Sequence, residues 1–195
     1  YNAMRNATVT SIAPTGTISI IAGTSSGIEP FFAISYVRNV MGTQLFEVNP
    51  VFEEMAKERG FYSTGLLRKI AKNGSIQKIS EIPSEIKRIF VTALDIAPEW
   101  HVKMQAAFQK YTDNAVAKTV NLPGDATLED VRRVFLLAYR LKCKGITVYR
   151  YGSKSEQVLV IGSTSELGSK SLSTERYVQV NEEYSGGCPT GTCPF

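Results

Sequence analysis

The chain has 195 residues, of which 43% are apolar and 21% charged, and its formal net charge is +4. This length suffices for one domain with a buried core, and the composition is ordinary for a soluble globular protein. The mild positive charge suits anionic ligands, but the lysines and arginines are scattered, so we expect no nucleic-acid partner. No apolar run approaches the ~20 residues of a membrane span. Three cysteines, two of them near the end, do not resemble a secreted disulfide framework, so we expect a cytoplasmic protein without a membrane partner.

The first element is a strand, a tight turn and the start of a helix. A β-branched run over Thr8–Ile12 predicts the strand, which Pro14 ends because proline has no N–H for a ladder. Residues 15–17 then turn the chain into one or two helical turns over 18–22. Such a turn presents several backbone N–H groups in one direction and can cradle a phosphate, with its threonine and serine hydroxyls as further donors. An ordinary strand-to-helix turn with a threonine cap is the alternative.

The next part of the chain predicts strands followed by amphipathic helices. Asn49 and Pro50 are typical of a helix start, with the asparagine as cap and the proline at the first position. We interpret these helices as solvated packing helices on the outside of a larger body. The predicted elements are a strand over 31–40, its continuation or partner over 41–45, and helices over 49–59, 65–72 and 83–91.

A longer helix is predicted over residues 99–111. Its large side chains recur at helical spacing, which predicts a buried stripe. His101 is the only histidine, and no base or metal partner is near it in the sequence, so we expect a surface or packing role and no protein metal site. The predicted buried stripe consists of Trp100, Met104, Ala107, Phe108 and Tyr111.

A strand, a helix and a second strand follow with short connections, which predicts a parallel crossover unit. The strands are predicted over 115–122 and 146–151, and the helix over 128–142. Asn121 and Arg150 lie at the carboxyl ends of these strands, where function sits in such folds. Cys143, late in the helix, is expected to be a buried structural thiol.

The last 42 residues, 154–195, are rich in Ser, Gly, Lys and Glu and predict a flexible tail. The tail ends with Cys188 and Cys193, which can close a small ring when oxidised. Thiolate attack through a mixed disulfide would let the pair exchange electrons with other thiols. Half of a zinc site and an incidental pair are the alternatives.

The segment Asn6–Ser19, followed by Ser26-Gly-Ile-Glu-Pro30, resembles the substrate-phosphate segment of the catalytic chain of ribonucleotide reductases. The adenosylcobalamin-dependent class is the most similar. The resemblance implies that the turn binds the diphosphate of the substrate, and the residues carried over are Pro14, Thr15, Gly16, Thr17, Ile18 and Ser19.

The blocks Asp95–Pro123 and Lys144–Ser153 resemble the same family. In its iron-dependent class, two adjacent tyrosines pass a radical into the site, whereas this chain has Tyr149 followed by Arg150. That departure favours adenosylcobalamin as the cofactor, although plain strand packing also explains Tyr149. The resemblance implies an α/β fold: residues 1–153 form the C-terminal part of a ten-stranded α/β barrel, followed by the tail 154–195.

The resemblance also implies an activity, the reduction of ribonucleoside diphosphates to deoxyribonucleoside diphosphates for DNA synthesis. Cys188 and Cys193 match the tail pair that reduces the active-site disulfide and is itself reduced by thioredoxin or glutaredoxin. The thiyl-radical cysteine loop is not in this sequence, so we expect an inactive piece that needs the upstream part of a homodimeric enzyme.

Three alternatives stay open. One is a non-catalytic nucleotide-binding remnant of a split reductase, and another is a fragment of an iron-dependent large chain. The third, an independent thiol oxidoreductase, is weakened by the lack of a thioredoxin-like Cys-x-x-Cys motif.

Overall fold

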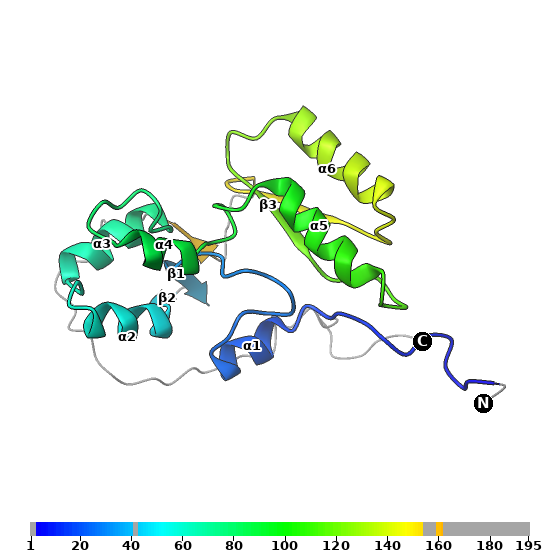
Figure 1. Ribbon diagram of the computed structural model, residues 1–195, viewed down its shortest axis with the longest axis horizontal. Coiled ribbons are helices and arrows are strands. Elements are labelled where there is room, and N and C mark those ends of the chain that lie inside the picture. The colour runs from blue at the N-terminus through cyan, green and yellow to red at the C-terminus, as the bar shows by residue number, and fades with distance from the viewer. Residues whose placement is uncertain (1–2, 41–42, 154–158, 162–195) are drawn as a thin grey trace.

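The computed structural model describes residues 3–40, 43–153 and 159–161. Figure 1 shows two groups of helices and strands, with the short helix α1 (Gly16–Ala22) beside them. The remaining residues of the predicted tail, including Cys188 and Cys193, lie outside the described residues.

The first group is a three-stranded sheet with three helices, and the strand order is β2-β1-β5. β1 pairs antiparallel with β2, from Ser35 opposite Val48 to Val40 opposite Thr43, so the predicted pairing after residue 40 is confirmed. The elements are β1 (Ser35–Val40), β2 (Thr43–Val48), α2 (Pro50–Glu58), α3 (Thr64–Asn73), α4 (Ser84–Ile89) and β5 (Leu159–Val160).

Side-chain caps define where two of these helices begin. The Asn49 side chain accepts a hydrogen bond from the Phe52 amide at 3.0 Å, as its place before Pro50 predicts. Ser63 caps α3 in the same way through the Leu66 amide, at 3.1 Å. The helices share a buried core with Ile34, the residue directly before β1. The largest fully buried side chains of this core are Ile34, Phe52, Ile70, Ile76 and Ile86.

The second group contains the predicted crossover. β3 (Thr119–Leu122) and β4 (Thr147–Arg150) are parallel, and α6 (Leu128–Arg140) connects them. A capping box between Thr127 and Asp130 begins α6, as the acidic residue three positions after the threonine predicts. The second core is enclosed by the two strands on one side and by α5 (Pro98–Gln109) and α6 on the other. It contains Val102, Val120, Leu122, Val134 and Ala138.

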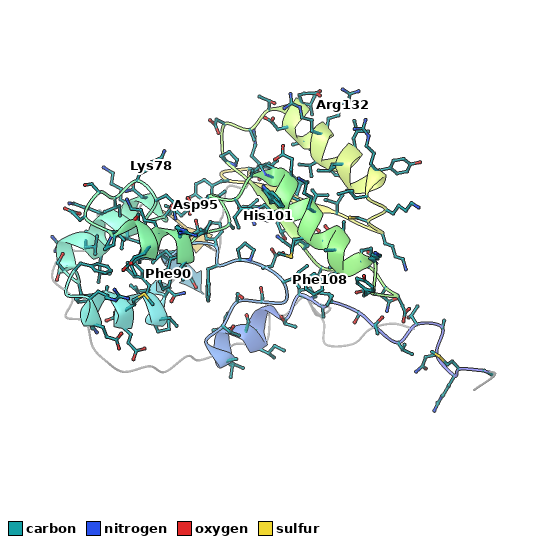
Figure 2. All side chains as sticks on the ribbon, viewed as in Figure 1. Lys78, Phe90, Asp95, His101, Phe108 and Arg132 are labelled. Atoms are coloured by element: carbon teal, nitrogen blue, oxygen red, sulfur yellow. The ribbon has the colours of Figure 1, made fainter. Side chains whose placement is uncertain are left out.

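The predicted buried stripe of α5 is wrong. Trp100, Met104, Phe108 and Tyr111 are exposed, and Figure 2 shows Phe108 on the side of the helix away from α6. The buried face instead carries His101, Val102, Gln105 and Gln109. Its polar side chains can be buried because backbone carbonyls accept their hydrogen bonds: the Gln105 amide group, for example, donates to Val116 and Gly145 oxygens at 3.1 and 2.7 Å.

The predicted strand over 8–12 is reduced to one parallel bridge, between Ile12 and Val116. The Asp113 carboxylate accepts hydrogen bonds from the amides of Val9 and Thr10, at 3.0 and 3.1 Å, so these amides bind a side chain instead of a strand. The segment that leads into α1 is therefore held beside the start of β3.

Of the helices that the structure describes, none has the length and apolar character required to span a bilayer.

Gly74 gives a test of the packing in the first group. It ends α3 at φ 69°, and a methyl group there would lie 2.6 Å from the Ile161 side chain. Gly60 has a similar φ of 73° but open space around it. We expect Gly60→Ala to lower the free energy of unfolding by about 1 kcal/mol, because only the backbone angle becomes strained. Gly74→Ala should lower it by at least about 1 kcal/mol more, because its methyl group also clashes with Ile161.

Urea denaturation of both variants and the parent measures this difference. Equal losses in the two variants would show that Ile161 does not pack against Gly74.

Candidate functional site

The predicted phosphate turn is a compact bend between the Ile12 bridge and α1. Thr15 has left-handed backbone angles, with φ 50°, and its carbonyl accepts the Ser19 amide at 3.0 Å. Because Ser19 makes this first helical bond, the amides of Gly16, Thr17 and Ile18 have no carbonyl partner within the helix. The structure thus brings the six predicted residues, 14–19, together in one bend.

Two of the predicted hydroxyl donors are engaged inside the bend. The Ser19 hydroxyl is buried and donates to the Gly16 carbonyl at 2.7 Å. The Thr15 hydroxyl oxygen accepts the Gly27 amide at 2.8 Å. These side chains hold the shape of the bend, and the three first-turn amides and the Thr17 hydroxyl are its remaining donors for an anion. The space beside Gly16 is open, since a methyl group there would meet nothing within 4 Å.

The segment 26–30 folds back onto this bend. Gly27 has a φ of +50°, and a methyl group on it would lie 3.0 Å from the Ala13 carbonyl oxygen. Only glycine combines this backbone angle with so close an approach. The Glu29 amide donates to the Ser26 carbonyl at 2.8 Å, which makes a tight turn and directs Glu29 away from the bend.

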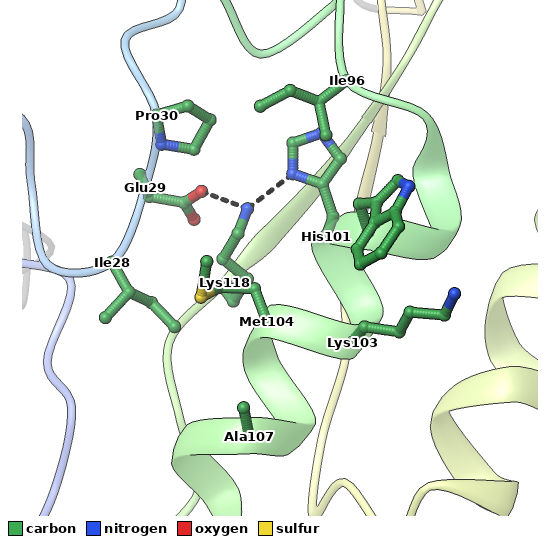
Figure 3. A pocket seen from close by; sticks show the side chains of 10 residues that line it. Ile28, Glu29, Pro30, Ile96, His101, Lys103, Met104, Ala107 and Lys118 are labelled. Carbon is green, nitrogen blue, oxygen red and sulfur yellow. Dashed lines mark hydrogen bonds and ion pairs between the residues drawn. The ribbon is translucent and has the colours of Figure 1, made fainter.

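Glu29 enters a buried polar network that was not predicted from the sequence. Its Oε2 accepts from the Lys118 ammonium at 2.5 Å, and its Oε1 accepts from the Thr119 amide at 2.5 Å. Lys118 also donates to His101 Nδ1 at 2.8 Å and to the Thr119 carbonyl at 2.6 Å. Figure 3 shows the Lys118 ammonium between Glu29 and His101.

Burial changes the ionisation of two members of this network. The Lys118 side chain is only 1% exposed, and this desolvation lowers its pKa although the hydrogen bond and charge of Glu29 act in the opposite direction. Desolvation, and then the charge of Lys118, lower the pKa of His101. His101 is therefore neutral near pH 7, and its Nε2–H donates to the Ala93 carbonyl at 3.0 Å because the ammonium occupies Nδ1.

The prediction of a surface or packing role for His101 is therefore incomplete. The histidine is 2% exposed and both of its ring nitrogens have hydrogen-bond partners. One signal for the network was present in the sequence. Lys118 alternates with Val116, Val120 and Leu122, so it lies on the apolar face of the strand, where a lone lysine requires a buried partner.

A pocket of about 580 Å³ lies next to this network. Glu29, His101 and Lys118 help to line it (Figure 3), and so do the α5 side chains Trp100, Met104 and Ala107. Since the hydrogen-bonding atoms of the network have partners, the pocket offers mainly apolar surface.

The other predicted residues contribute less to a site. Arg150 is at the end of β4, and its guanidinium is 3.5 Å from the Ala126 carbonyl. Cys143 is half-buried against the second core, and burial raises the pKa of its thiol, in line with a structural role. Cys188 and Cys193 lie outside the described residues.

Comparison with known proteins identifies relatives along nearly the whole chain. The family described as "Ribonucleotide reductase, barrel domain" matches residues 1–149. The vitamin B12-dependent ribonucleoside-diphosphate reductase of Mycobacterium tuberculosis (strain ATCC 25618 / H37Rv) is 49% identical over 191 residues, covering 98% of this chain and 26% of the relative. The enzyme of that name from Thermoplasma acidophilum is 49% identical over 201 residues, with 97% and 26% covered.

A solved structure has a similar fold. The alpha subunit of the class Id ribonucleotide reductase of Actinobacillus ureae matches with a TM-score of 0.64 and 27% identity, over 76% of this chain and 27% of that chain. The chain thus spans about a quarter of the length of these relatives.

The single histidine makes the network testable by NMR. We expect the His101 ring to titrate with a midpoint below the ordinary ~6.5, and to carry its proton on Nε2 in the neutral form. The pKa of His101 is then lower in the folded than in the unfolded chain, so the unfolded chain takes up the proton first as the pH falls. The contribution of the neutral ring to the free energy of unfolding is therefore complete above pH ~6.5 and decreases below it.

Ring ¹³C and ¹⁵N shifts followed from pH 4 to pH 8 measure both properties. Lys118→Met is the matched variant, and its midpoint should rise because one of the two lowering causes is removed. A midpoint at or above ~6.5 in the parent would contradict the network.

Proposed function

Because the chain belongs to the ribonucleotide reductase family, we propose that it is the substrate-phosphate and electron-delivery part of an adenosylcobalamin-dependent ribonucleoside-diphosphate reductase. In this proposal residues 1–153 form the C-terminal part of the catalytic barrel, and residues 154–195 form the reducing arm. The whole enzyme is a cytoplasmic homodimer that makes deoxyribonucleoside diphosphates for DNA synthesis.

The geometry of residues 14–19 carries the phosphate-binding part of the proposal. Three amides, of Gly16, Thr17 and Ile18, begin α1 without helical acceptors, and the space at Gly16 is open. Backbone amides can approach a phosphate more closely than long side chains can, and they need no side-chain ordering on binding. Internal bonds of Thr15 and Ser19 hold the bend in shape before the ligand arrives.

The names of the relatives support adenosylcobalamin as the cofactor, which supplies the radical that starts ribose reduction in such enzymes. The described residues do not fit a ligand for its cobalt. The corrin ring of the cofactor itself holds the cobalt, so a protein would add at most one ligand such as an imidazole, and both nitrogens of His101, the single histidine, are already engaged. We therefore assign cobalamin binding to other parts of the reductase.

Apolar side chains on two helices support a larger assembly. Ile18 and Ile21 of α1, and Trp100 and Met104 of α5, are exposed, and Trp100 is 62% accessible. A surface with this many large apolar side chains is typical of an interface. Since the relatives are about four times as long, we propose that the upstream part of the reductase chain covers these residues.

The arm supplies electrons in the proposed cycle. Each turnover oxidises two thiols of the active site to a disulfide, as the ribose 2′-hydroxyl leaves as water. The Cys188 and Cys193 dithiol reduces that disulfide by thiolate exchange and becomes a disulfide itself. Thioredoxin or glutaredoxin then returns both electrons and protons to the pair.

Complementation tests the proposed function. We expect no deoxyribonucleotide from this chain alone, and turnover when it is mixed with the upstream part of the reductase, adenosylcobalamin and a dithiol. In the mixture, Gly16→Val should raise KM for a ribonucleoside diphosphate about tenfold, because its side chain fills the anion space and blocks charge-assisted hydrogen bonds.

Gly145→Val is the control, since Gly145 also has open space around it and lies outside the bend. Turnover by this chain alone would contradict the proposal that it needs the upstream part of the reductase. Diphosphate binding without any rescue of the upstream part would favour the non-catalytic remnant.

The arm is tested separately with Cys193→Ser in the same mixture. This variant should complete a single turnover after reduction of the enzyme but lose multiple turnovers with thioredoxin, because it cannot form the arm disulfide. Cys143→Ser is the matched control and should retain multiple turnovers, as Cys143 packs against the second core. Unchanged multiple turnovers in Cys193→Ser would exclude the arm as the electron carrier.

A further inference from the structure

We propose that the Glu29–Lys118 ion pair, supported by His101, positions the phosphate-binding bend, and that Lys118 is a positioning residue for nucleotide binding. The inference rests on the proposed function, because it assumes that residues 14–19 receive the substrate phosphates. Lys118 does not touch the substrate in this proposal. It acts through the segment that joins the bend to the start of β3.

The first step is the connection between the ion pair and the bend. The Gly27 amide donates to the Thr15 hydroxyl oxygen at 2.8 Å, and Gly27 lies so close to the Ala13 carbonyl that a side chain would not fit between them. Only Ile28 separates Gly27 from Glu29, and the Glu29 amide is fixed to Ser26 at 2.8 Å. A shift of Glu29 would therefore be transmitted through one tight turn to Thr15, whose carbonyl begins α1.

The second step is the way in which Glu29 is held. Its two carboxylate oxygens bind two adjacent residues of the same strand entry, the Lys118 ammonium and the Thr119 amide, each at 2.5 Å. The ammonium has three hydrogens, and three acceptors meet them: Glu29, His101 and the Thr119 carbonyl. Each donor of the buried ammonium therefore has an acceptor, and moving Glu29 would leave one donor without its partner.

The third step is the connection from Lys118 through His101 back to the segment that contains Glu29. His101 donates to the Ala93 carbonyl at 3.0 Å, and the Ala93 amide donates to the Phe31 carbonyl at 2.9 Å. Phe31 follows Glu29 by two residues, so the network returns to the segment from which it started. Residues 29–31 are thus fixed from both sides, by β3 and by the chain that leads into α5.

The Lys118 side chain is 1% exposed and that of Glu29 is 22% exposed, and such an ion pair adds little net stability because desolvation offsets much of the attraction. Its effect is to select one geometry. A merely structural role predicts that replacing Lys118 lowers the melting temperature and leaves nucleotide binding unchanged. A positioning role predicts weaker binding of every ligand that carries a diphosphate.

The test uses the complete reductase that contains this chain. Lys118→Met keeps the length of the side chain and removes its charge and donors. We expect it to raise both KM for the ribonucleoside diphosphate and Ki for inorganic pyrophosphate about tenfold, with kcat within about twofold. Glu29→Gln retains an acceptor for Thr119 and should raise both constants less, by about threefold.

Lys69→Met is the matched control, because Lys69 pairs with Glu81 on the exposed surface, and it should leave both constants unchanged. Unchanged KM and Ki in Lys118→Met, with both raised in Gly16→Val, would overturn the inference and leave the proposed function intact. Unchanged values in both variants would overturn the proposed function too. If Lys118→Met does not fold, Glu29→Gln decides: unchanged constants in that variant also overturn the inference.

Discussion

A lysine ammonium buried beside a strand is the constraint on which this structure depends. Removing the Lys118 charge from water is unfavourable, so the fold must bring it three acceptors, and two of them, Glu29 and His101, come from other parts of the chain. Glu29 lies 89 residues before Lys118 in the sequence, and His101 lies 17 before it. The requirement to neutralise one charge thereby joins the bend over 14–19, α5 and β3 into one body.

The two apolar cores, unlike the polar network, each form within a single group of elements. Each group of elements buries its own apolar cluster, around Phe52 in the first and Val120 in the second. Neither cluster includes the outer face of α5 or the exposed isoleucines of α1. Neither of these two clusters reaches the bend, which is fixed against the second group by the polar network together with the Ile12–Val116 bridge, while apolar surface remains for a larger partner.

Local features of the fold could be predicted from the sequence. Asn49 with Pro50, and Thr127 with Asp130, place helix starts because a cap and its amide are close neighbours in the chain. The bend over 14–19 was predictable from Pro14 and Gly16, although no side-chain cap begins α1. The buried face of α5 was not, because apolar side chains occur on both of its faces and the acceptors for Gln105 lie outside the helix, at Val116 and Gly145.

The proposed role of the bend requires that the amides of residues 16–18 bind the substrate phosphates. A crystal structure of the complete reductase with a bound ribonucleoside diphosphate would show these contacts. We expect diphosphate oxygens within about 3.2 Å of these amide nitrogens, with the Glu29–Lys118 pair intact behind them. A diphosphate bound elsewhere, with the three amides bonded to protein groups, would contradict this role.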